Sequence, residues 1–248
     1  MPSPDSPAIL VTGGAKRVGA AIVRDLHAAG CRVAIHCHVS LAAAQALSAE
    51  LNALRPDSSC VLQADLLDCA ALPALVAEVI ARFGRLDGLV NNASSFFPTA
   101  LGSIDEAAWL DLIGSNLKAP LFLTQAAAPH LAASGGAVVN IVDIHADRPL
   151  EGYPVYSVAK AGLQGLTRSL AIELAPRVRV NGIAPGAIEW PEDGQFSAAQ
   201  RAGIVAHTPL QRTGRADEIA HAVRFLLLDA SYVTGQILAV DGGRSARL

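Results

Sequence analysis

Tyr156, Lys160 and Asp143 have the residue types and spacing that proton transfer requires. Tyr156 and Lys160 stand four residues apart in the stretch YSVAK, and Asp143 precedes the tyrosine by thirteen residues. Positions four apart on a helix share a face, so the phenol and the ammonium are expected to point the same way. An ammonium about 4 Å away, at an effective dielectric near 20, stabilises a phenolate by roughly 4 kcal/mol, or about three pKa units. We therefore predict that Tyr156 exchanges a proton near neutral pH.

A glycine-rich turn near the N-terminus has the pattern of a phosphate-binding site. The stretch ILVTGGAKRVG places Gly13, Gly14 and Gly19 between an apolar run and a helical pattern. Such a turn directs backbone N–H groups and the positive end of a helix toward an anion. Arg17 stands in the first turn of that helix, where a cation is favourable if an anion lies beside it. An exposed basic pair with Lys16 is the alternative interpretation.

Residues at the ends of the next apolar runs are candidates for cofactor contacts. No Asp or Glu follows the second run, where a ribose 2′-hydroxyl is usually held. Together with Arg17, this missing negative charge favours NADP(H) over NAD(H). Asp65 is placed to reach an adenine amino group, and Leu66 to pack beside the ring. The cofactor contacts predicted from these runs are His36, His38, Ser40, Asp65, Leu66, Asn92, Ala93 and Ser94.

The elements that must hold these residues alternate between strands and helices. Short apolar runs predict seven strands, and several are apolar on both faces, as in a parallel sheet covered by helices. We therefore predict an α/β fold with a doubly wound, seven-stranded parallel sheet of the Rossmann type in one domain, 1–248. The strands are expected at 8–11, 32–36, 60–64, 88–92, 137–142, 178–183 and 236–240, and the helices near 18–29, 40–55, 69–83, 105–133, 155–174 and 215–228.

Residues 187–213 form a long irregular stretch that we expect to be a substrate lid. A loop of this length in a compact domain is more often functional than a plain connection. Ser40, Asp105 and Ser197 are expected helix starts, because their side chains can accept from free backbone N–H groups. Within the lid, the residues expected to shape substrate selectivity are Glu189, Trp190, Glu192 and Asp193.

Composition excludes several classes of protein. The 248 residues are 52% hydrophobic and 17% charged, which argues against disorder. A net charge of −3 offers no footprint for nucleic acid, and no apolar run reaches the roughly 18 residues that span a membrane. The N-terminus lacks an export segment, and the four cysteines and the histidines lack metal-ligand spacing. We expect a cytoplasmic protein with reduced thiols and no metal, nucleic-acid or membrane partner.

In combination, these motifs resemble the short-chain dehydrogenase/reductase superfamily, and within it the pteridine reductases. The matching stretches are TGGAKRVG, NNASSFFPT, GSN, NIVD, YSVAK and RVNGIAPG, in order along nearly the whole chain. Most of the superfamily has a serine about where Asp143 stands, whereas pteridine reductases have an aspartate. This sequence departs at Val39, where pteridine reductases often carry an arginine that clamps the 2′-phosphate. The expected phosphate contacts are therefore Arg17, His38 and Ser40.

The resemblance implies reduction of a pterin with NADPH, in which Tyr156, Lys160 and Asp143 manage the proton. Dihydropterin to tetrahydropterin is the expected step, with oxidised pterin or dihydrofolate as further substrates. The resemblance also implies a homotetramer, a water chain supported by Asn116, and a tail whose Arg247 reaches a neighbouring subunit's site. The implied substrate contacts are Arg17, Ser94, Phe96, Asp143 and Tyr156, with Phe96 stacking on the pterin and Phe97 packing into the protein; Tyr156, Lys160, Pro185 and Gly186 join the cofactor contacts.

Alternatives remain at this stage. A reductase of carbonyl compounds or 3-oxoacyl thioesters in the same superfamily would use the same tyrosine and lysine on a ketone. A non-catalytic NADP-binding protein would keep the glycine turn without turnover. Asp143 itself either orients Tyr156 or an ordered water, or caps backbone N–H groups at the end of a strand.

Overall fold

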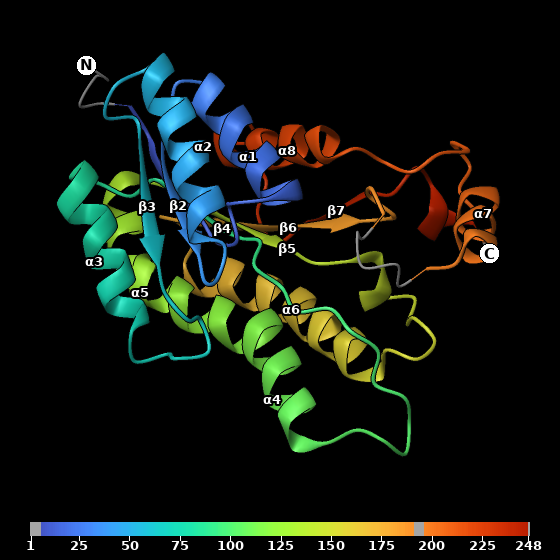
Figure 1. The fold of residues 1–248 in the computed structure, drawn as a ribbon. Coiled ribbons are helices and arrows are strands. Elements are labelled where there is room, and N and C mark those ends of the chain that lie inside the picture. The colour runs from blue at the N-terminus through green and yellow to red at the C-terminus, as the bar shows by residue number, and fades with distance from the viewer. Residues whose placement is uncertain (1–5, 191–195, 248) are drawn as a thin grey trace.

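Strands and helices alternate through residues 6–190 and 196–247, the residues that this computed structural model describes. In that part of the chain seven strands form a single parallel sheet in the order β3-β2-β1-β4-β5-β6-β7 (Figure 1). The predicted doubly wound sheet is confirmed, and strand ends differ from the prediction by at most two residues. The strands are β1 Ala8–Val11, β2 Arg32–Cys37, β3 Ser59–Gln63, β4 Gly88–Asn91, β5 Ala137–Ile141, β6 Arg179–Pro185 and β7 Ile237–Val240.

Helices cover both faces of the sheet. Figure 1 shows α1, α2 and α8 on one face and α3, α4, α5 and α6 on the other. None of the helices within the described ranges is both long enough and apolar enough to cross a membrane. The helices are α1 Arg17–Ala28, α2 Leu41–Leu54, α3 Leu72–Phe83, α4 Glu106–Ile113, α5 Ala119–Ser134, α6 Pro154–Glu173, α7 Ala198–Ala206 and α8 Ala216–Arg224.

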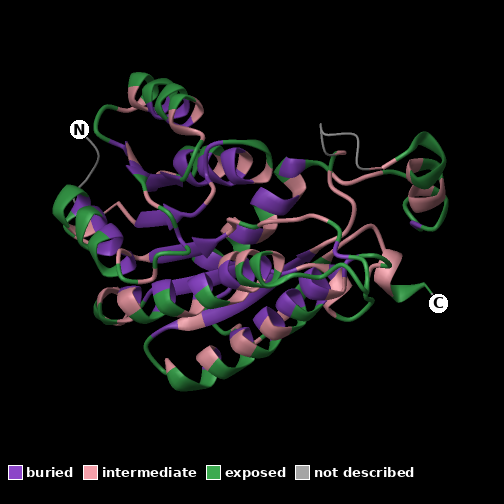
Figure 2. Ribbon diagram, turned by 60° about the horizontal axis from the view of Figure 1, so that its bottom comes forward, coloured by how far each residue is buried: buried purple, intermediate pink, exposed green. Residues whose placement is uncertain are grey.

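Alternation along the strands divides the core between the two faces. In β1, Ile9 and Val11 pack into the cluster beneath α1, α2 and α8, whereas Ala8 and Leu10 pack into the cluster beneath α3 and α5. Successive strand side chains point to opposite faces, so an all-apolar strand supplies both clusters. Figure 2 shows the consequence: buried residues fill the sheet and the inward helix faces, while the outer faces are exposed.

The helix predicted at 105–133 is not one regular α-helix. A π-helical stretch, Gly114–Lys118, separates α4 from α5. Pro120 has no backbone N–H to donate to the carbonyl of Asn116, four residues earlier, and its ring crowds that carbonyl. A second π-helical stretch, Phe225–Asp229, ends the helix predicted at 215–228. The first of these stretches carries Asn116, one of the predicted site residues.

Two of the three predicted helix starts cap their helices with a side chain. Asp105 accepts from the backbone N–H of Ala108, and Ser197 accepts from that of Gln200. Ser40 precedes α2 but makes no such capping bond. The segment predicted as irregular contains α7, so that prediction is wrong for Ala198–Ala206, which is rich in helix-forming alanine, while the lid role stays a prediction.

Candidate active site

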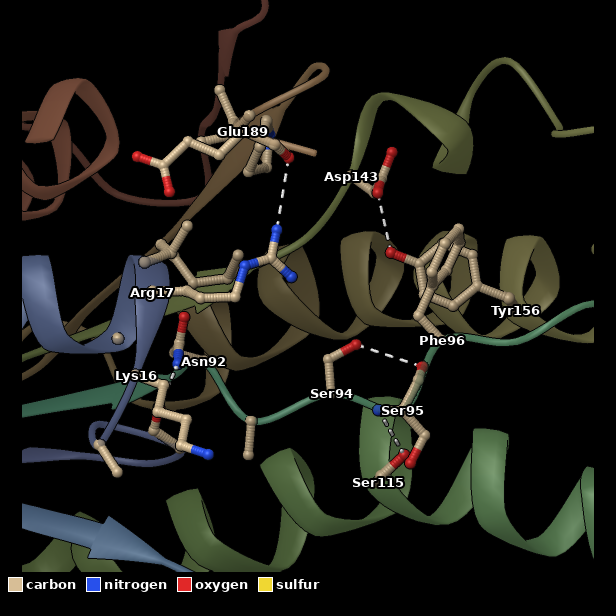
Figure 3. A pocket seen from close by; sticks show the side chains of 18 of the residues that line it. Lys16, Arg17, Asn92, Ser94, Ser95, Phe96, Ser115, Asp143, Tyr156 and Glu189 are labelled. Atoms are coloured by element: carbon tan, nitrogen blue, oxygen red, sulfur yellow. Dashed lines mark hydrogen bonds between the residues drawn. The ribbon is translucent and has the colours of Figure 1, made fainter. Parts of the chain in front are cut away.

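A cavity of about 680 Å³ lies at the carboxyl ends of the strands, where open parallel sheets bind ligands. Loops that follow β1 to β6 contribute to its wall. Figure 3 shows side chains from the loops after β1, β4, β5 and β6 around the cavity. All the predicted site residues except Asn116 and Lys160 line this cavity. The predicted residues that line the cavity are Gly13, Arg17, Gly19, His36, His38, Ser40, Asp65, Leu66, Asn92, Ala93, Ser94, Phe96, Asp143, Tyr156, Pro185 and Gly186.

The glycine turn is shaped by backbone geometry that other residues do not fit. Gly13 adopts a φ of +60°, in the left-handed region that glycine enters without strain. A Cβ at Gly19 would overlap the carbonyl oxygen of Gly13 and approach the Asn92 amide. The start of α1 therefore packs directly against the turn, and its free N–H groups border the cavity.

Asn92 and Thr12 brace this turn against the end of β4. The Asn92 side-chain amide donates to the carbonyl oxygens of Thr12 at 2.9 Å and Gly13 at 3.1 Å. The Thr12 hydroxyl accepts from the backbone N–H groups of Asn92 and Ala93 at 2.9 and 3.0 Å. The turn is thus held by hydrogen bonds before any ligand arrives.

His36 braces the turn from the other side, a contact that the sequence did not predict. Its ring is 1% exposed, Nδ1 accepts from the Gly13 N–H at 3.2 Å, and Nε2 contacts the Ala64 carbonyl oxygen at 3.1 Å. Burial lowers the pKa of His36 to about 4. The neutral ring therefore carries its proton on Nε2 and donates it to Ala64. Both nitrogens are engaged, so His36 positions the turn; the residue also lines the cavity, and its predicted contact with the cofactor stays a prediction.

The loops after β2 and β3 border the opposite end of the cavity from Tyr156. Ser40 makes no hydrogen bond through its hydroxyl in the described structure and stands at the N-terminus of α2. His38 lies beside it and is exposed, whereas Val39 points to solvent with 83% of its surface accessible. In the next loop, Asp65 accepts from the Leu67 N–H at 2.9 Å. His38 and the Ser40 hydroxyl therefore stand beside the Asp65 carboxylate at this end of the cavity, and their predicted contacts with a cofactor phosphate stay a prediction.

Both carboxylate oxygens of Asp143 accept hydrogen bonds. Its Oδ2 accepts from the Tyr156 hydroxyl at 2.8 Å, as Figure 3 shows. Its Oδ1 accepts from the backbone N–H of His145 at 2.8 Å and so caps the short 3₁₀ helix Ile144–Ala146. The two interpretations of Asp143 made from the sequence are therefore both realised, one on each oxygen. The cap fixes the carboxylate while its second oxygen orients the phenol.

The expected lowering of the phenol pKa is wrong in this structure. Burial, and then the Asp143 carboxylate beside it, raise the pKa of Tyr156 well above its usual value. The Lys160 ammonium lies 5.6 Å from the Tyr156 ring centroid and donates to the Ile141 carbonyl oxygen at 2.8 Å. Burial lowers the pKa of Lys160 to about 8. Tyr156 is therefore a neutral phenol, ready to donate a proton.

Asn116 is buried, and its contacts lie in the loop that follows β4. Its Oδ1 accepts from the Ser94 hydroxyl at 2.7 Å, and its Nδ2 donates to the carbonyl oxygens of Ser95 at 2.9 Å and Leu112 at 3.0 Å. Among the described residues these contacts position Ser94 and Ser95 but do not reach Lys160. The water chain implied for Asn116 stays a prediction.

Aromatic residues form one wall beside the phenol. The Phe96 ring stacks on Tyr153, with centroids 4.7 Å apart and planes 11° apart, and it meets Tyr156 edge-on at 4.8 Å and 73°. Such pairs favour these offset and T-shaped arrangements. Phe97 packs against the same cluster but does not line the cavity, as predicted. Phe96 is therefore held in a fixed relation to the proton donor.

The first part of the lid lies against the glycine turn. The Arg17 guanidinium donates to the Glu189 carbonyl oxygen at 3.3 Å. The Glu189 carboxylate accepts from the Ala216 N–H at 3.2 Å, at the start of α8. Trp190 lies between Phe196, 6.1 Å away between ring centroids, and the Arg201 guanidinium, 5.4 Å from its ring. The predicted roles of Glu192 and Asp193 fall outside the described residues.

Several cavity residues were not anticipated from the sequence. Ser95 and Ser115 adjoin predicted residues, and the GSN stretch is the signal that would have found Ser115. Arg244 follows the Asp-Gly-Gly stretch near the C-terminus and has no local signal. Its tail neighbour Arg247 donates to the Ala206 carbonyl oxygen of the same chain. The unanticipated lining residues include Ser95, Asp111, Ser115, His145, Leu150, Ile188, Phe196, Ile204 and Arg244.

Comparison with known proteins identifies the family of this chain. A family model described as enoyl-(acyl carrier protein) reductase matches residues 13–245. The chain is 41% identical to pteridine reductase 1 of Leishmania tarentolae, with 98% of each protein covered. It is 38% identical to a 3-oxoacyl-(acyl-carrier-protein) reductase of Escherichia coli, over 94% of this chain and 95% of the relative. A Staphylococcus aureus reductase of the same name is 36% identical over 94% and 96%. The chain therefore belongs to the short-chain dehydrogenase/reductase superfamily.

Proposed function

We propose that this oxidoreductase uses NADPH to reduce a pterin ring, with dihydropterin to tetrahydropterin as its main reaction. The observation that carries the proposal is the Tyr156 hydroxyl donating to Asp143 at 2.8 Å inside the cavity. A pterin presents amino and amide N–H donors as well as a ring nitrogen to be protonated. A carboxylate accepts from such donors, whereas a serine hydroxyl in its place would also donate. The 41% identity to a pteridine reductase supports the same assignment.

The residues present fit a dinucleotide. The braced glycine turn offers N–H groups and a helix start to phosphates, and Gly19 leaves no side chain between them. Arg17, His38 and Ser40 border the cavity, and no carboxylate follows β2 to hold a free 2′-hydroxyl. These features support NADP(H) over NAD(H). When bound, the nicotinamide supplies the hydride.

The chain's own residues supply orientation and the proton. Phe96 gives the flat substrate a surface at a fixed angle to Tyr156. Asp143 aligns the phenol and accepts from substrate N–H groups, while Tyr156 holds the proton that a ring nitrogen receives. The buried Lys160 ammonium, held by Ile141, stabilises the phenolate that remains after this transfer.

Substrate comparison tests the proposal. We expect purified protein to oxidise NADPH much faster with dihydrobiopterin than with acetoacetyl-CoA, and with NADPH in preference to NADH. Asp143→Ser should lower kcat for dihydrobiopterin by about a hundredfold, because the phenol loses the fixed carboxylate that aligns it and the substrate N–H groups lose an anionic acceptor. Lower kcat with an unchanged melting temperature would separate this effect from misfolding. Dihydrobiopterin reduction that survives Asp143→Ser unchanged would exclude the assigned role.

A 3-oxoacyl thioester reductase is the second candidate, since relatives of that name are 36–38% identical over nearly the whole chain. A ketone oxygen needs hydroxyl donors, and Asp143 supplies only acceptors when ionised. Faster turnover of acetoacetyl-CoA than of dihydrobiopterin would favour this candidate. Tight NADPH binding without turnover of either substrate would instead indicate a non-catalytic NADP-binding protein.

A further inference from the structure

The C-terminal tail holds Arg244 in a defined place. Asp241 accepts from the backbone N–H groups of Gly243 at 2.8 Å and Ser245 at 2.6 Å, on either side of Arg244. The Arg148 guanidinium donates to the Ser245 carbonyl oxygen at 3.5 Å, which ties the tail to the segment that follows Asp143. The tail therefore lies beside the catalytic segment and not beside the nucleotide loops.

The other side of the tail contacts the lid. Arg247 donates to the Ala206 carbonyl oxygen at 3.1 Å, at the end of α7. Ile204 in the same helix lines the cavity, as does Arg244. Arg244 thus borders the cavity between the lid helix and the segment that carries Asp143.

The Arg244 guanidinium makes no hydrogen bond or ion pair in the described structure, although the residue is partly buried. The nearby charged groups of the site are already engaged: Asp143 with Tyr156 and His145, and the Glu189 carboxylate with Ala216. A partly buried guanidinium carries five donors arranged to meet a carboxylate or phosphate. Among the described residues, the catalytic end of the site therefore holds a cation without an anionic partner.

Apolar side chains line the cavity together with this cation. Leu150, Phe196 and Ile204 line the cavity with Arg244, and Trp190 adjoins them. A substituent that suits this wall is apolar or aromatic near the ring and negatively charged at its end. A short neutral hydroxylated substituent leaves the Arg244 donors without an anion.

We propose that Arg244 selects substrates whose ring carries an anionic tail, and carboxylate is the group it favours. The inference rests on the proposed pterin function, because the ring must lie at Phe96 and Asp143 for its tail to reach Arg244. It assigns a specificity-determining role to a residue outside the proton-transfer machinery.

The experiment compares two dihydropterins that differ in tail charge: dihydrofolate, with two tail carboxylates, and dihydrobiopterin, with a neutral tail. Arg244→Gln removes the charge, Arg244→Lys keeps it, and Arg168→Gln makes the same change at an exposed arginine of α6. We expect Arg244→Gln to raise KM for dihydrofolate at least five times more than KM for dihydrobiopterin. Arg244→Lys should restore most of the original KM for dihydrofolate. Arg168→Gln should change neither KM value.

Equal changes in the two KM values, or none, would overturn the proposal. Calorimetry of folate and biopterin binding to the NADP⁺-loaded protein tests the selectivity of Arg244 separately from the proposed reaction. If neither dihydropterin is reduced but folate binds through Arg244 at least fivefold more tightly than in Arg244→Gln, the reaction fails and the selectivity stands. If both are reduced with no dependence on Arg244, the selectivity alone fails. If neither ligand binds, both fail.

Discussion

At the scale of single residues, Asp143 shows why the site holds a neutral phenol. One oxygen of its carboxylate is fixed by a backbone cap, so the other has a defined direction toward Tyr156. Burial raises the pKa of Tyr156, and the Asp143 carboxylate that accepts from the phenol raises it further, because both favour the protonated phenol. The Lys160 ammonium alone would lower the pKa of Tyr156. The Asp-for-Ser difference therefore alters the proton donor as well as the substrate contacts.

His36 provides a test of the bracing at this scale. Its pKa is about 4 in the folded protein and about 6.5 in an unfolded chain. The unfolded state therefore binds more protons between these values, so the stabilisation is complete above pH 6.5 and is lost as pH falls through 4. A shift of this size corresponds to roughly 3 kcal/mol. Asp65 raises the pKa of His36 and His38 lowers it, and both effects are smaller than that of burial.

We expect the free energy of unfolding to fall more steeply between pH 7 and pH 4 in the native protein than in His36→Asn. Asparagine offers an acceptor and a donor but does not titrate. Denaturant unfolding at several pH values measures the difference. Parallel curves for the two proteins would show that His36 is not buried in the neutral form.

At the scale of elements, the start of α1 depends on close contact with the glycine turn. A methyl group at position 19 would overlap the Gly13 carbonyl oxygen and crowd the Asn92 amide that braces it. Gly19→Ala should therefore displace the turn and raise KM for NADPH by tenfold or more, with a smaller effect on kcat. NADPH titration and steady-state kinetics measure both.

Gly165→Ala in α6 is the matched control. A Cβ at Gly165 meets nothing within 4 Å, and alanine is the better helix former by about 1 kcal/mol. This variant should be slightly stabilised, with an unchanged KM for NADPH. If Gly19→Ala behaved in the same way, the tight packing of turn and helix would be contradicted.

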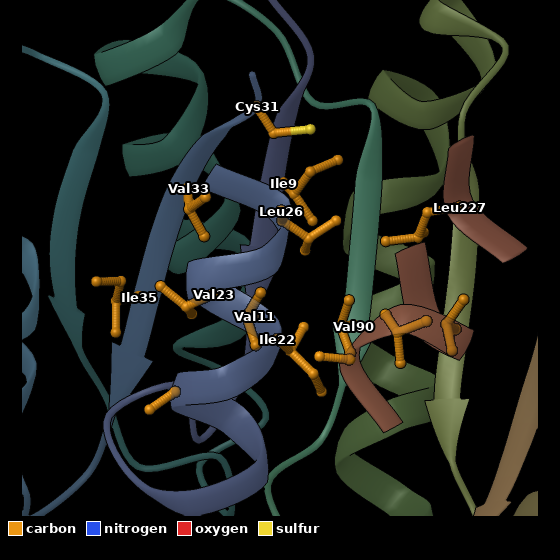
Figure 4. Close-up of a cluster of buried hydrophobic side chains, with 14 of the residues drawn as sticks. Ile9, Val11, Ile22, Val23, Leu26, Cys31, Val33, Ile35, Val90 and Leu227 are labelled. Carbon is orange, nitrogen blue, oxygen red and sulfur yellow. The ribbon is translucent and has the colours of Figure 1, made fainter. Parts of the chain in front are cut away.

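The regular elements were predictable because burial on both faces leaves a strong pattern. Ile9, Val11, Val33 and Ile35 project from adjacent strands into the cluster beneath α1 in Figure 4. The π-helical stretch at 114–118 leaves the apolar spacing nearly unchanged, so periodicity alone did not separate it from an α-helix. Its physical cause, the missing N–H of Pro120, acts on a single hydrogen bond.

The parts of the site that the sequence did not predict depend on contacts between distant segments. His36 meets Ala64 twenty-eight residues away, and the Arg148 contact with Ser245 joins segments ninety-seven residues apart. Local motifs placed His36 and His38, at the end of the predicted strand 32–36, among the cofactor contacts. Only the packing of three strand ends shows that one of them faces inward and the other outward.

At the scale of the whole molecule, the chain's two ends have different relations to the site. The N-terminal strand lies in the middle of the sheet, whereas the C-terminal tail returns across the lid beside α7 (Figure 1). Asp241, directly after β7, fixes the tail by accepting from two backbone N–H groups. Burial alone would raise the pKa of Asp241, but the hydrogen bonds that it accepts from Ser245 and Gly243 lower it. The tail thus links the last strand, the lid helix and the segment after Asp143.

Deleting residues 245–248 removes three of these links: the Ser245 bonds to Asp241 and Arg148, and the Arg247 bond to Ala206. No residue described in that range belongs to the buried core, so the melting temperature should change by less than about 2 °C. KM for dihydropterin should rise several-fold because α7 and Arg244 lose their anchor. KM for NADPH should stay constant, because its proposed phosphate contacts at the glycine turn, His38 and Ser40 make no hydrogen bond to the described residues of the tail. Steady-state kinetics with each substrate varied separately measures both constants. Unchanged KM values for the two substrates would mean that the tail rests on the lid without supporting it.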